Sequence, residues 1–337
     1  MKPPFGGRHR VTFRLKDSPE VLTSTMKLFA LSLALCVPAA FAADSAADLQ
    51  KKFVGAWKLI SREGPNQQPA NGKPFGVIMY DDTGHMAVQI ANGDRPAFSN
   101  GPAKATQKEM ANAYASYTAY YGTYTFEPQN NMVIHHLEGS NTPGMIGQDY
   151  FRYFEIKGNR LTLSVANDGK GGRMAFKDTT AHLTWEKLPA TTVAPADLQE
   201  KFLGSWKLIS IEGPNQQNGK PAGVITFDDT GHMTVQIGRG DRPAFPSGRA
   251  KATDEEMAQA FSTYTAYYGT YTFEPQNNIV IYHLEGSIGP GQIGQDNIRY
   301  FELKGNRLRL SVANDGKGGR IPFKDTTAHF TWEKLPK

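Results

Sequence analysis

The sequence FVGAWKLIS stands at residues 53–61 and returns as FLGSWKLIS at residues 202–210. The tryptophans of the two segments are 149 positions apart, and the offset becomes 147 after Pro69-Ala70, which the second copy lacks. It stays at 147 to the last two tryptophans, Trp185 and Trp332. A period of this length is too long for a solenoid and gives each copy the size of a complete domain. The sequence therefore predicts one domain written twice.

The copies are expected at residues 47–189 and 196–336, joined by a linker at 190–195. Because this linker is short, we expect the two domains to lie close together. Most of each copy consists of short β-like runs separated by turn residues. In the first copy these runs are 57–61, 77–80, 86–90, 123–127, 132–138, 149–156, 161–166 and 181–187, with a further short strand expected at 173–176. Eight to ten such strands per copy indicate an antiparallel barrel or sandwich and an all-β fold.

One short helix is expected to interrupt the strands of each copy. Thr106-Gln107-Lys108-Glu109 has the pattern of a capping box, and Thr253-Asp254-Glu255-Glu256 repeats it. Apolar residues then follow at helical spacing up to Tyr117, and Gly122 is expected to end the helix.

Gly55-x-Trp57 and Gly204-x-Trp206, each after a short turn-forming stretch, resemble the lipocalin signature. A wider ordered set resembles the bacterial and fungal lipocalin-like domain family: Gly84–Gln89, Asp94-Arg95-Pro96, Ala119–Tyr124, His136–Ser140, Arg152 and Gly158–Leu163. The resemblance covers each copy nearly end to end. It implies a calycin-type up-and-down barrel whose cavity holds one small ligand. It implies no reaction, because a fold does not determine a function.

The first residues of the chain have the features of an export signal. Met26-Lys27 precedes the apolar run 28–37, and Ala40-Phe41-Ala42 forms a small-residue cleavage site, so residues 26–42 are expected to be a signal peptide. Residues 1–25 are interpreted as a mis-annotated extension, the alternative being a long basic leader. Cys36, the single cysteine, lies inside the signal, so the mature chain is expected to have no disulfide and to be periplasmic or secreted.

The charge balance argues against nucleic acid as a partner. The chain has 37 Lys+Arg and 32 Asp+Glu, but residues 1–42 carry much of the excess of bases. The remaining near-neutral body lacks the basic surface that a phosphate backbone requires. No other apolar run approaches the length of 28–37, so no membrane span is expected in the mature protein. The oligomeric state is left open.

His136 and Glu138, repeated as His283 and Glu285, are the candidate catalytic residues. Residues two apart on a strand face the same way, and a histidine beside a carboxylate can act as a general base. The alternative is a structural polar network, either on the outer face or inside the barrel, because alternation along this strand does not decide which face is inside. His135 points to the opposite face and becomes a tyrosine in the second copy, so no metal site and no cofactor are expected.

Six further side chains are candidate ligand-binding residues. Arg152 and Arg299 could anchor an anionic group, because a guanidinium matches a carboxylate in bidentate fashion. Arg95 and Arg242 stand between Asp and Pro and either line the barrel mouth or pair locally with the aspartate. Tyr124 and Tyr271, with Tyr80, Tyr120 and Tyr153, either line a cavity or simply pack, and the four tryptophans are expected to close the barrel floor.

Two other motifs are interpreted as turns. Asp82-Thr83-Gly84 and Asp229-Thr230-Gly231 resemble the motif of a bilobed aspartic protease, but their place between strands favours a hairpin loop. The glycine-rich segments 167–173 and 314–320 lack a following helix N-terminus and are interpreted as hairpin turns, not phosphate loops.

The leading hypothesis is an exported tandem lipocalin-like protein that binds a small apolar or amphipathic molecule in its barrels. The competing hypothesis is an isomerase or hydrolase of a small hydrophobic substrate, with a histidine, glutamate and arginine site. A third possibility is a structural envelope module whose barrels are filled by side chains.

Overall fold

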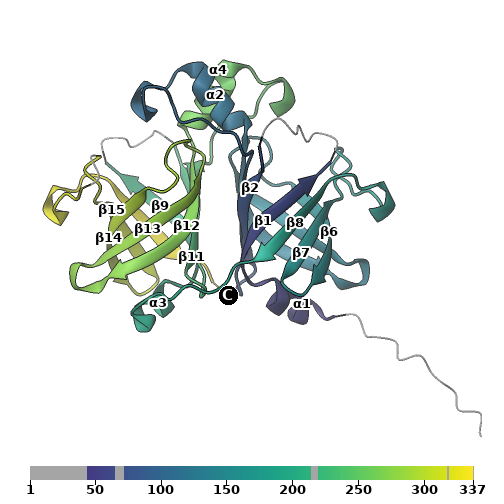
Figure 1. Cartoon of the computed structure of the whole chain (residues 1–337), viewed down its shortest axis with the longest axis horizontal. Coiled ribbons are helices and arrows are strands. Elements are labelled where there is room, and N and C mark those ends of the chain that lie inside the picture. Colours follow the sequence, from purple (N-terminus) through teal and green to yellow (C-terminus); the bar gives the residue numbers. More distant parts are fainter. Residues whose placement is uncertain (1–43, 65–71, 214–218, 317–318, 337) are drawn as a thin grey trace, which may run out of the picture. The chain divides into compact units, whose positions relative to one another are not determined.

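The computed structural model describes residues 44–64, 72–213, 219–316 and 319–336. Along this part of the chain, two closed antiparallel barrels of eight strands each follow one another (Figure 1). This architecture confirms the predicted all-β fold with two tandem barrels. The expected extension 1–25 and signal peptide 26–42, with Cys36, lie outside the described residues. In the described ranges, no helix has the length and apolar character needed to cross a membrane.

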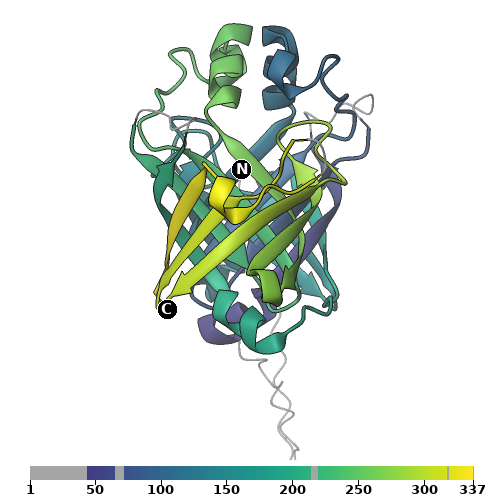
Figure 2. The ribbon, with the colours of Figure 1, turned by 90° about the vertical axis from the view of Figure 1, so that its left-hand side faces the viewer.

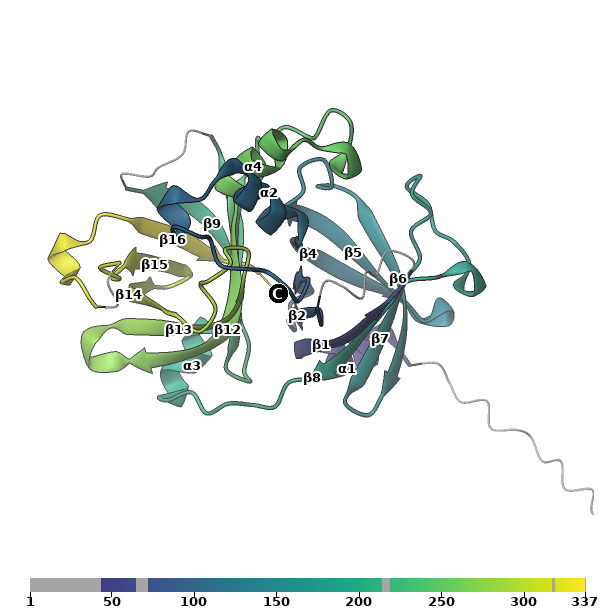
Figure 3. The ribbon, with the colours of Figure 1, turned by 45° about the horizontal axis from the view of Figure 1, so that its top comes forward.

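The strands of the first barrel pair in the order of the sequence, and β8 pairs with β1 to close the ring (Figure 3). One helix precedes the strands, and a second stands between β3 and β4. The elements are α1 (Ala46–Phe53), β1 (Gly55–Glu63), β2 (Phe75–Tyr80), β3 (His85–Ala91), α2 (Gln107–Ala115), β4 (Tyr117–Glu127), β5 (Met132–Ser140), β6 (Asp149–Lys157), β7 (Arg160–Val165) and β8 (His182–Lys187).

The second barrel repeats this order, and β16 pairs with β9 to close it. Its elements are α3 (Ala196–Phe202), β9 (Gly204–Glu212), β10 (Pro221–Phe227), β11 (His232–Arg239), α4 (Asp254–Ser262), β12 (Thr265–Glu274), β13 (Ile279–Ser287), β14 (Asp296–Lys304), β15 (Arg307–Val312) and β16 (His329–Lys334).

The Gly-x-Trp pair joins α1 to the barrel. Gly55 has a φ of 118°, which favours glycine where the chain turns from α1 into β1. Two residues on, the Trp57 indole donates to the Phe53 carbonyl at 2.7 Å, and Lys187 Nζ lies 5.1 Å from the Trp57 ring centre. The second copy repeats the contact, with Trp206 donating to Phe202 at 2.8 Å.

Aromatic and aliphatic side chains fill the interior of each barrel. Phe53, at the end of α1, is fully buried and meets three interior rings edge-on, those of Tyr80, Phe126 and Phe154, at 4.8–5.2 Å. Edge-to-face contacts of this kind stabilise aromatic clusters beyond the area they bury. All four tryptophans are almost completely buried: Trp57, Trp185, Trp206 and Trp332. One end of each barrel is thereby closed by a helix and by aromatic rings.

Three local predictions differ from the structure. The expected helix ends at Ala115, and Tyr117 begins β4, because the spacing of its apolar residues also suits a strand buried on both faces. The extra strand expected at 173–176 is absent from the described residues there: an isolated bridge joins Asn167 to Arg173, and a 3-10 turn follows at Phe176–Asp178. The turn-forming stretch before β1 is the helix α1, whose N-cap Ser45 accepts from the Asp48 amide.

The outer faces of β3 and β4 meet those of β11 and β12. The Gln89 side chain of β3 donates to the backbone carbonyls of Val235 and Tyr267. The Gln236 side chain of β11 donates to the backbone carbonyls of Val88 and Tyr120. Positions 89 and 236 correspond in the two copies, so the contact is reciprocal, as in a two-fold dimer. The helices α2 and α4 lie side by side above this contact (Figure 2).

Candidate functional site

Strand β5 shows which of the two neighbouring histidines faces the interior of the first barrel. Val133 and Leu137 belong to the interior cluster, so His135 between them faces inward and His136 faces outward. On the adjacent strand, Arg152 stands opposite Val133 and therefore also points into the barrel. The structure thus brings His135, which the sequence analysis set aside, together with Arg152.

His135 links two tyrosine hydroxyl groups inside the first barrel. Its Nε2 lies 2.9 Å from the Tyr80 hydroxyl and its Nδ1 lies 3.3 Å from the Tyr120 hydroxyl. All three side chains are buried, and burial holds the pKa of His135 well below its ordinary value. A neutral imidazole has one donor and one acceptor nitrogen, so it satisfies both hydroxyls.

Arg152 brings a positive charge into the same interior. It is 8% exposed and donates to the Phe151 carbonyl at 2.8 Å and to the Asn167 side chain at 2.6 Å. Its guanidinium lies 4.9 Å from the centre of the Tyr150 ring. No ion pair with a carboxylate is found for Arg152 among the described residues. A buried guanidinium without a counter-charge favours a ligand that carries accepting oxygens.

The second barrel keeps the arginine and changes its surroundings. Arg299 stands opposite Val280, an interior residue, and donates to the Ile298 carbonyl at 2.8 Å and to the Asn314 side chain at 2.9 Å. The positions of Tyr80, His135 and Tyr150 are taken by other residues, namely Phe227, Tyr282 and Asn297.

The open end of the second barrel, opposite α3, has a groove of about 490 Å³. Apolar side chains from five strands line it, among them Ile211, Ile237, Val312 and Phe330. Ile211, Ile237 and Phe330 also pack against the interior cluster, so the groove leads from the surface to the barrel contents. Polar side chains also line the groove, among them Ser210, Glu212 and Arg239, so the entrance combines apolar and polar groups.

The candidate catalytic residues lie on the outer surface of the barrels. His136 Nδ1 is 2.7 Å from Asp149 and its Nε2 is 2.8 Å from the Thr125 hydroxyl. His283 repeats this contact with Asp296 at 2.8 Å. The histidine partners are therefore aspartates of the next strand, while Glu138 and Glu285 are exposed. A catalytic role for these pairs stays a prediction.

Arg95 and Arg242 lie between the two barrels. Arg95 donates across the contact to the carbonyls of Ser287 and Ile288, and its guanidinium lies 4.8 Å from the Tyr117 ring centre. Burial lowers the pKa of Arg95 to about 10. Arg242 donates reciprocally to the carbonyls of Ser140 and Asn141. Both side chains thus join the barrels through carbonyl groups, and a role in ligand binding stays a prediction.

Tyr124 and Tyr271 lie inside the barrels, and each hydroxyl already has an acceptor. Tyr124 donates to the Asp81 carbonyl at 2.8 Å, and Tyr271 donates to the Asp228 carbonyl at 3.1 Å. Each of these side chains therefore contributes the apolar surface of its ring to the interior, and its hydroxyl is already paired. Tyr153, expected beside them, lies on the outer face, where its ring centre is 5.4 Å from that of Phe176.

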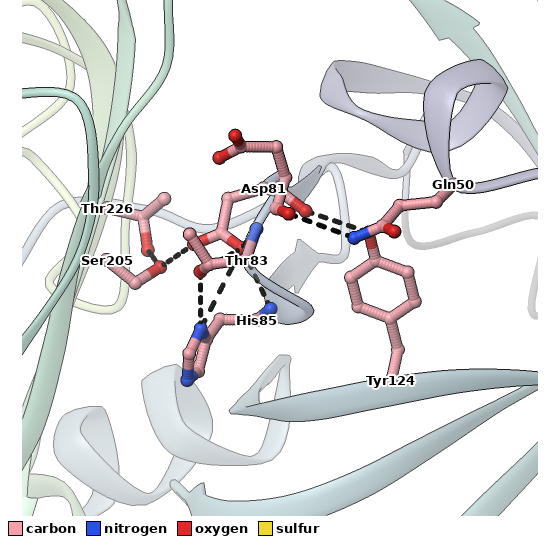
Figure 4. Close-up of polar contacts among 8 residues, drawn as sticks. Gln50, Asp81, Thr83, His85, Tyr124, Ser205 and Thr226 are labelled. Carbon is pink, nitrogen blue, oxygen red and sulfur yellow. Dashed lines mark hydrogen bonds and ion pairs between the residues drawn. The ribbon is translucent and has the colours of Figure 1, made fainter. Parts of the chain in front are cut away.

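The first Asp-Thr-Gly motif forms a hairpin turn between β2 and β3 (Figure 4). Asp81 accepts from the backbone amides of Thr83 and His85 at 2.9 and 2.8 Å. Ser205 of the second copy donates to the other Asp81 oxygen at 2.6 Å and also meets Thr226. This carboxylate therefore stabilises both the turn and the contact between the barrels by accepting hydrogen bonds from each.

Asp228, the counterpart of Asp81, lacks a matching serine, because position 56 is alanine where the second copy has Ser205. Burial raises the pKa of Asp228 to about 6, although Thr230 and His232 donate to it. The folded protein therefore holds a proton that the unfolded chain loses above pH 4.

We expect the contribution of Asp228 to the free energy of unfolding to fall by up to about 3 kcal/mol as the pH rises from about 4 to about 6, and then to level off. Urea unfolding of wild type and Asp228→Asn at several pH values measures this difference. The Asp228→Asn variant should lose this fall of the unfolding free energy with pH, whereas Asp229→Asn, at the exposed neighbouring position, should keep it. Equal slopes in wild type and Asp228→Asn would contradict the prediction.

In the described part of the chain, no group of three or more His, Cys, Asp or Glu side chains is placed to hold a metal ion. The buried polar residues that sequence reasoning missed are His135 and Tyr282, which stand opposite the half-buried Tyr150 and Asn297 of the next strand. His135 alternates with Val133 and Leu137, as Tyr282 does with Val280 and Leu284. Knowing that Val133 stands opposite Arg152 would have placed this face of the strand inside the barrel.

Comparisons with known proteins identify the repeated unit. The model of the family described as the lipocalin-like domain matches residues 54–188 and 203–335. The 4'-hydroxy-3'-methoxypropiophenone carrier protein ppsC of Aspergillus oryzae is 34% identical over 93 residues, which are 26% of this chain and 81% of the carrier.

Two solved structures are similar over most of the chain. Uncharacterized protein YLR301w from Saccharomyces cerevisiae has a TM-score of 0.38 and 8% identity, covering 83% of this chain and 97% of its own. A protein of unknown function from Nostoc punctiforme has a TM-score of 0.19 and 11% identity, covering 87% and 100%. The two family matches and the carrier relative lead to one conclusion: the chain belongs to the lipocalin-like domain family and contains two copies of that domain.

Proposed function

We propose that each barrel binds a small molecule with an apolar, aromatic body and hydrogen-bond-accepting oxygens, and that the protein carries this molecule without transforming it. The observation that supports the proposal is a set of buried donors without acceptors. The indole nitrogens of Trp185 and Trp332 are buried and lack a hydrogen-bond partner among the described residues. Arg152 and Arg299 add positive charge without a carboxylate partner in the same interiors.

Unpaired donors make an occupied barrel more stable than an empty one. A buried polar group without a partner costs about 1–3 kcal/mol, and a ligand oxygen that accepts from it removes that cost. The aromatic rings around these donors match a flat apolar body. The Aspergillus relative is named as carrier of an aromatic ketone with hydroxy and methoxy groups, a molecule of this chemistry. Carriage is favoured over catalysis because His136 and His283 lie on the outer surface.

We also propose that the protein is exported to the periplasm or secreted, on the basis of residues 26–42. Cell fractionation of a reporter fused to the chain tests this. Export should persist when the chain is started at Met26, and lost export of that shorter version would contradict Met26 as the start.

The binding proposal is tested on the arginines that both barrels share. The double variant Arg152→Met/Arg299→Met should weaken binding of 4'-hydroxy-3'-methoxypropiophenone by about tenfold or more, because hydrogen bonds to charged groups contribute about 1.5–3 kcal/mol. Quenching of tryptophan fluorescence in the full-length protein reports the affinity. The matched control is Arg160→Met/Arg307→Met, which removes one exposed arginine from each copy and should bind as wild type. Unchanged affinity in the interior variant would contradict the proposal.

A further inference from the structure

The interiors of the two barrels differ at the centre of the proposed site. Three polar positions of the first barrel are changed in the second: Tyr80 to Phe227, His135 to Tyr282 and Tyr150 to Asn297. Most other interior positions are the same, among them the arginine and the tyrosines at 120 and 267. Two copies that otherwise agree so closely therefore present different hydrogen-bonding groups to whatever they hold.

In the first barrel the polar groups at these three positions have partners within the protein. Tyr80, His135 and Tyr120 form a chain of contacts at 2.9 and 3.3 Å. The Tyr150 hydroxyl donates to the Met145 sulfur at 3.3 Å. These groups need no ligand to complete their hydrogen bonds.

In the second barrel one buried hydroxyl, that of Tyr282, has no partner among the described residues. Tyr282 is 1% exposed, and its hydroxyl has no hydrogen-bond partner among the described residues. Phe227, whose ring centre is 6.1 Å away, offers no polar atom where the first barrel has the Tyr80 hydroxyl. Tyr267 is the other ring beside it, at 6.3 Å. Tyr282 lies between Val280 and Leu284 on the inner face of β13, so its hydroxyl is enclosed within the barrel.

We propose that Tyr282 is the specificity-determining residue of the second barrel and donates a hydrogen bond to a neutral oxygen of the ligand, of the ketone or ether class. This inference rests on the proposed carrier function and makes the two barrels unequal. Arg299 strengthens the preference for an accepting oxygen, because its positive charge faces the same interior. Asn297 leaves more room beside the arginine than the Tyr150 ring does, which suits a ligand group at that place.

The phenol of Tyr282 can distinguish between ligands in a way that a phenylalanine at this position could not. A site with a buried hydroxyl selects a ligand carbonyl over a methylene in the same position, because the methylene leaves the hydroxyl unpaired. The first barrel lacks this unpaired hydroxyl, so its preference for a carbonyl is expected to be weaker.

The test uses the full-length protein and two probes that differ in one group. These are 4'-hydroxy-3'-methoxypropiophenone and 2-methoxy-4-propylphenol, in which a methylene replaces the carbonyl. Isothermal titration gives the affinities, and native mass spectrometry gives the number of molecules bound. In wild type, one of two sites should prefer the ketone by about tenfold, and Tyr282→Phe should reduce that preference to nearly one.

Tyr80→Phe is the matched control, since it removes a hydroxyl that has a partner and makes position 80 like Phe227. It should melt at a lower temperature than wild type and leave the ketone preference of the second barrel unchanged. Tyr282→Phe should melt no lower than wild type, because the hydroxyl it removes is unpaired in the ligand-free protein.

The outcomes separate this inference from the function on which it rests. If wild type binds the ketone and Tyr282→Phe keeps the full preference, the role of Tyr282 is wrong and the carrier function stands. If Tyr282→Phe melts well below wild type, the hydroxyl has a structural partner and the inference is again wrong. If wild type binds neither probe, the proposed ligand class and the inference both fail.

Discussion

Replacing Gln89 with alanine is expected to lower the free energy of unfolding by about 2–4 kcal/mol, because it leaves several buried polar groups without partners. The Gln89 side chain is fully buried between the barrels. Its amide nitrogen donates to the Thr234 hydroxyl at 2.5 Å, and to the carbonyls of Val235 and Tyr267 at 3.1 and 2.9 Å. Its oxygen accepts from the Tyr117 hydroxyl at 2.6 Å.

The second copy provides a reciprocal test of the same contact. Gln236 donates to Val88 and Tyr120, and accepts from the Tyr264 hydroxyl at 2.7 Å. Gln236→Ala should therefore be destabilising to a similar degree. Gln50→Ala is the control, because the bond of Gln50 to the Asp82 carbonyl is exposed and its loss should change stability by less than about 0.5 kcal/mol. Denaturant unfolding at pH 7 compares the variants, and equal stability of Gln89→Ala and Gln50→Ala would contradict the account.

Cutting the chain between the barrels is expected to leave the two halves associated. Each half contributes a buried glutamine and an arginine to the contact, and Arg95 and Arg242 each donate to two carbonyls of the opposite barrel. Two-fold contacts of this reciprocal kind are typical of stable homodimers. A protease site inserted between Pro189 and Ala190, which are both exposed, would break the chain without removing a contact.

Size-exclusion chromatography of the cut protein measures whether the halves separate. At micromolar concentration they should elute together at the size of the intact chain. In the Arg95→Ala/Arg242→Ala background they should separate, because the carbonyls of Ser287, Ile288, Ser140 and Asn141 each lose an arginine donor from the opposite barrel. Separate elution of the halves with both arginines present would show that the linker alone holds the barrels together.

The barrels themselves were largely predictable from local patterns. Short strands, turn residues and the capping box at Thr106 are local signals. They predict eight to ten strands and an inserted helix in each copy, and the structure has eight strands and that helix. The helical prediction for Tyr117 is wrong because β4 is buried on both faces, inside by the barrel and outside by the other copy. A strand of this kind loses the alternation that distinguishes it from a helix.

The same cause hid the inward-facing histidine. Val133 lies inside the barrel, but Ile134 on the outer face is also covered, by Met132, Ala166 and the partly buried Met174. Both faces of β5 therefore look apolar in the sequence, and nothing local separates His135 from His136. Which face of β5 lies inside is decided only when the barrel closes and β5 pairs with β6. That closure depends on residues far along the chain.

The place of Arg95 was equally beyond a local pattern. Its neighbours Asp94 and Pro96 suggest a local ion pair or a position at the barrel mouth. Its acceptors, the carbonyls of Ser287 and Ile288, are 192 and 193 residues away in the sequence. Backbone carbonyls carry no residue-specific signal, so only the packing of the two copies reveals this contact.

The carrier function is tested most directly by native mass spectrometry of the full-length protein, purified without denaturation. One or two bound molecules per chain are expected, which on release are small, aromatic and rich in accepting oxygens. A mass without any bound molecule, together with no mass gained on incubation with 4'-hydroxy-3'-methoxypropiophenone or other small aromatic ketones, would contradict it. The barrels would then be filled by their own side chains, and the protein would act as a structural module.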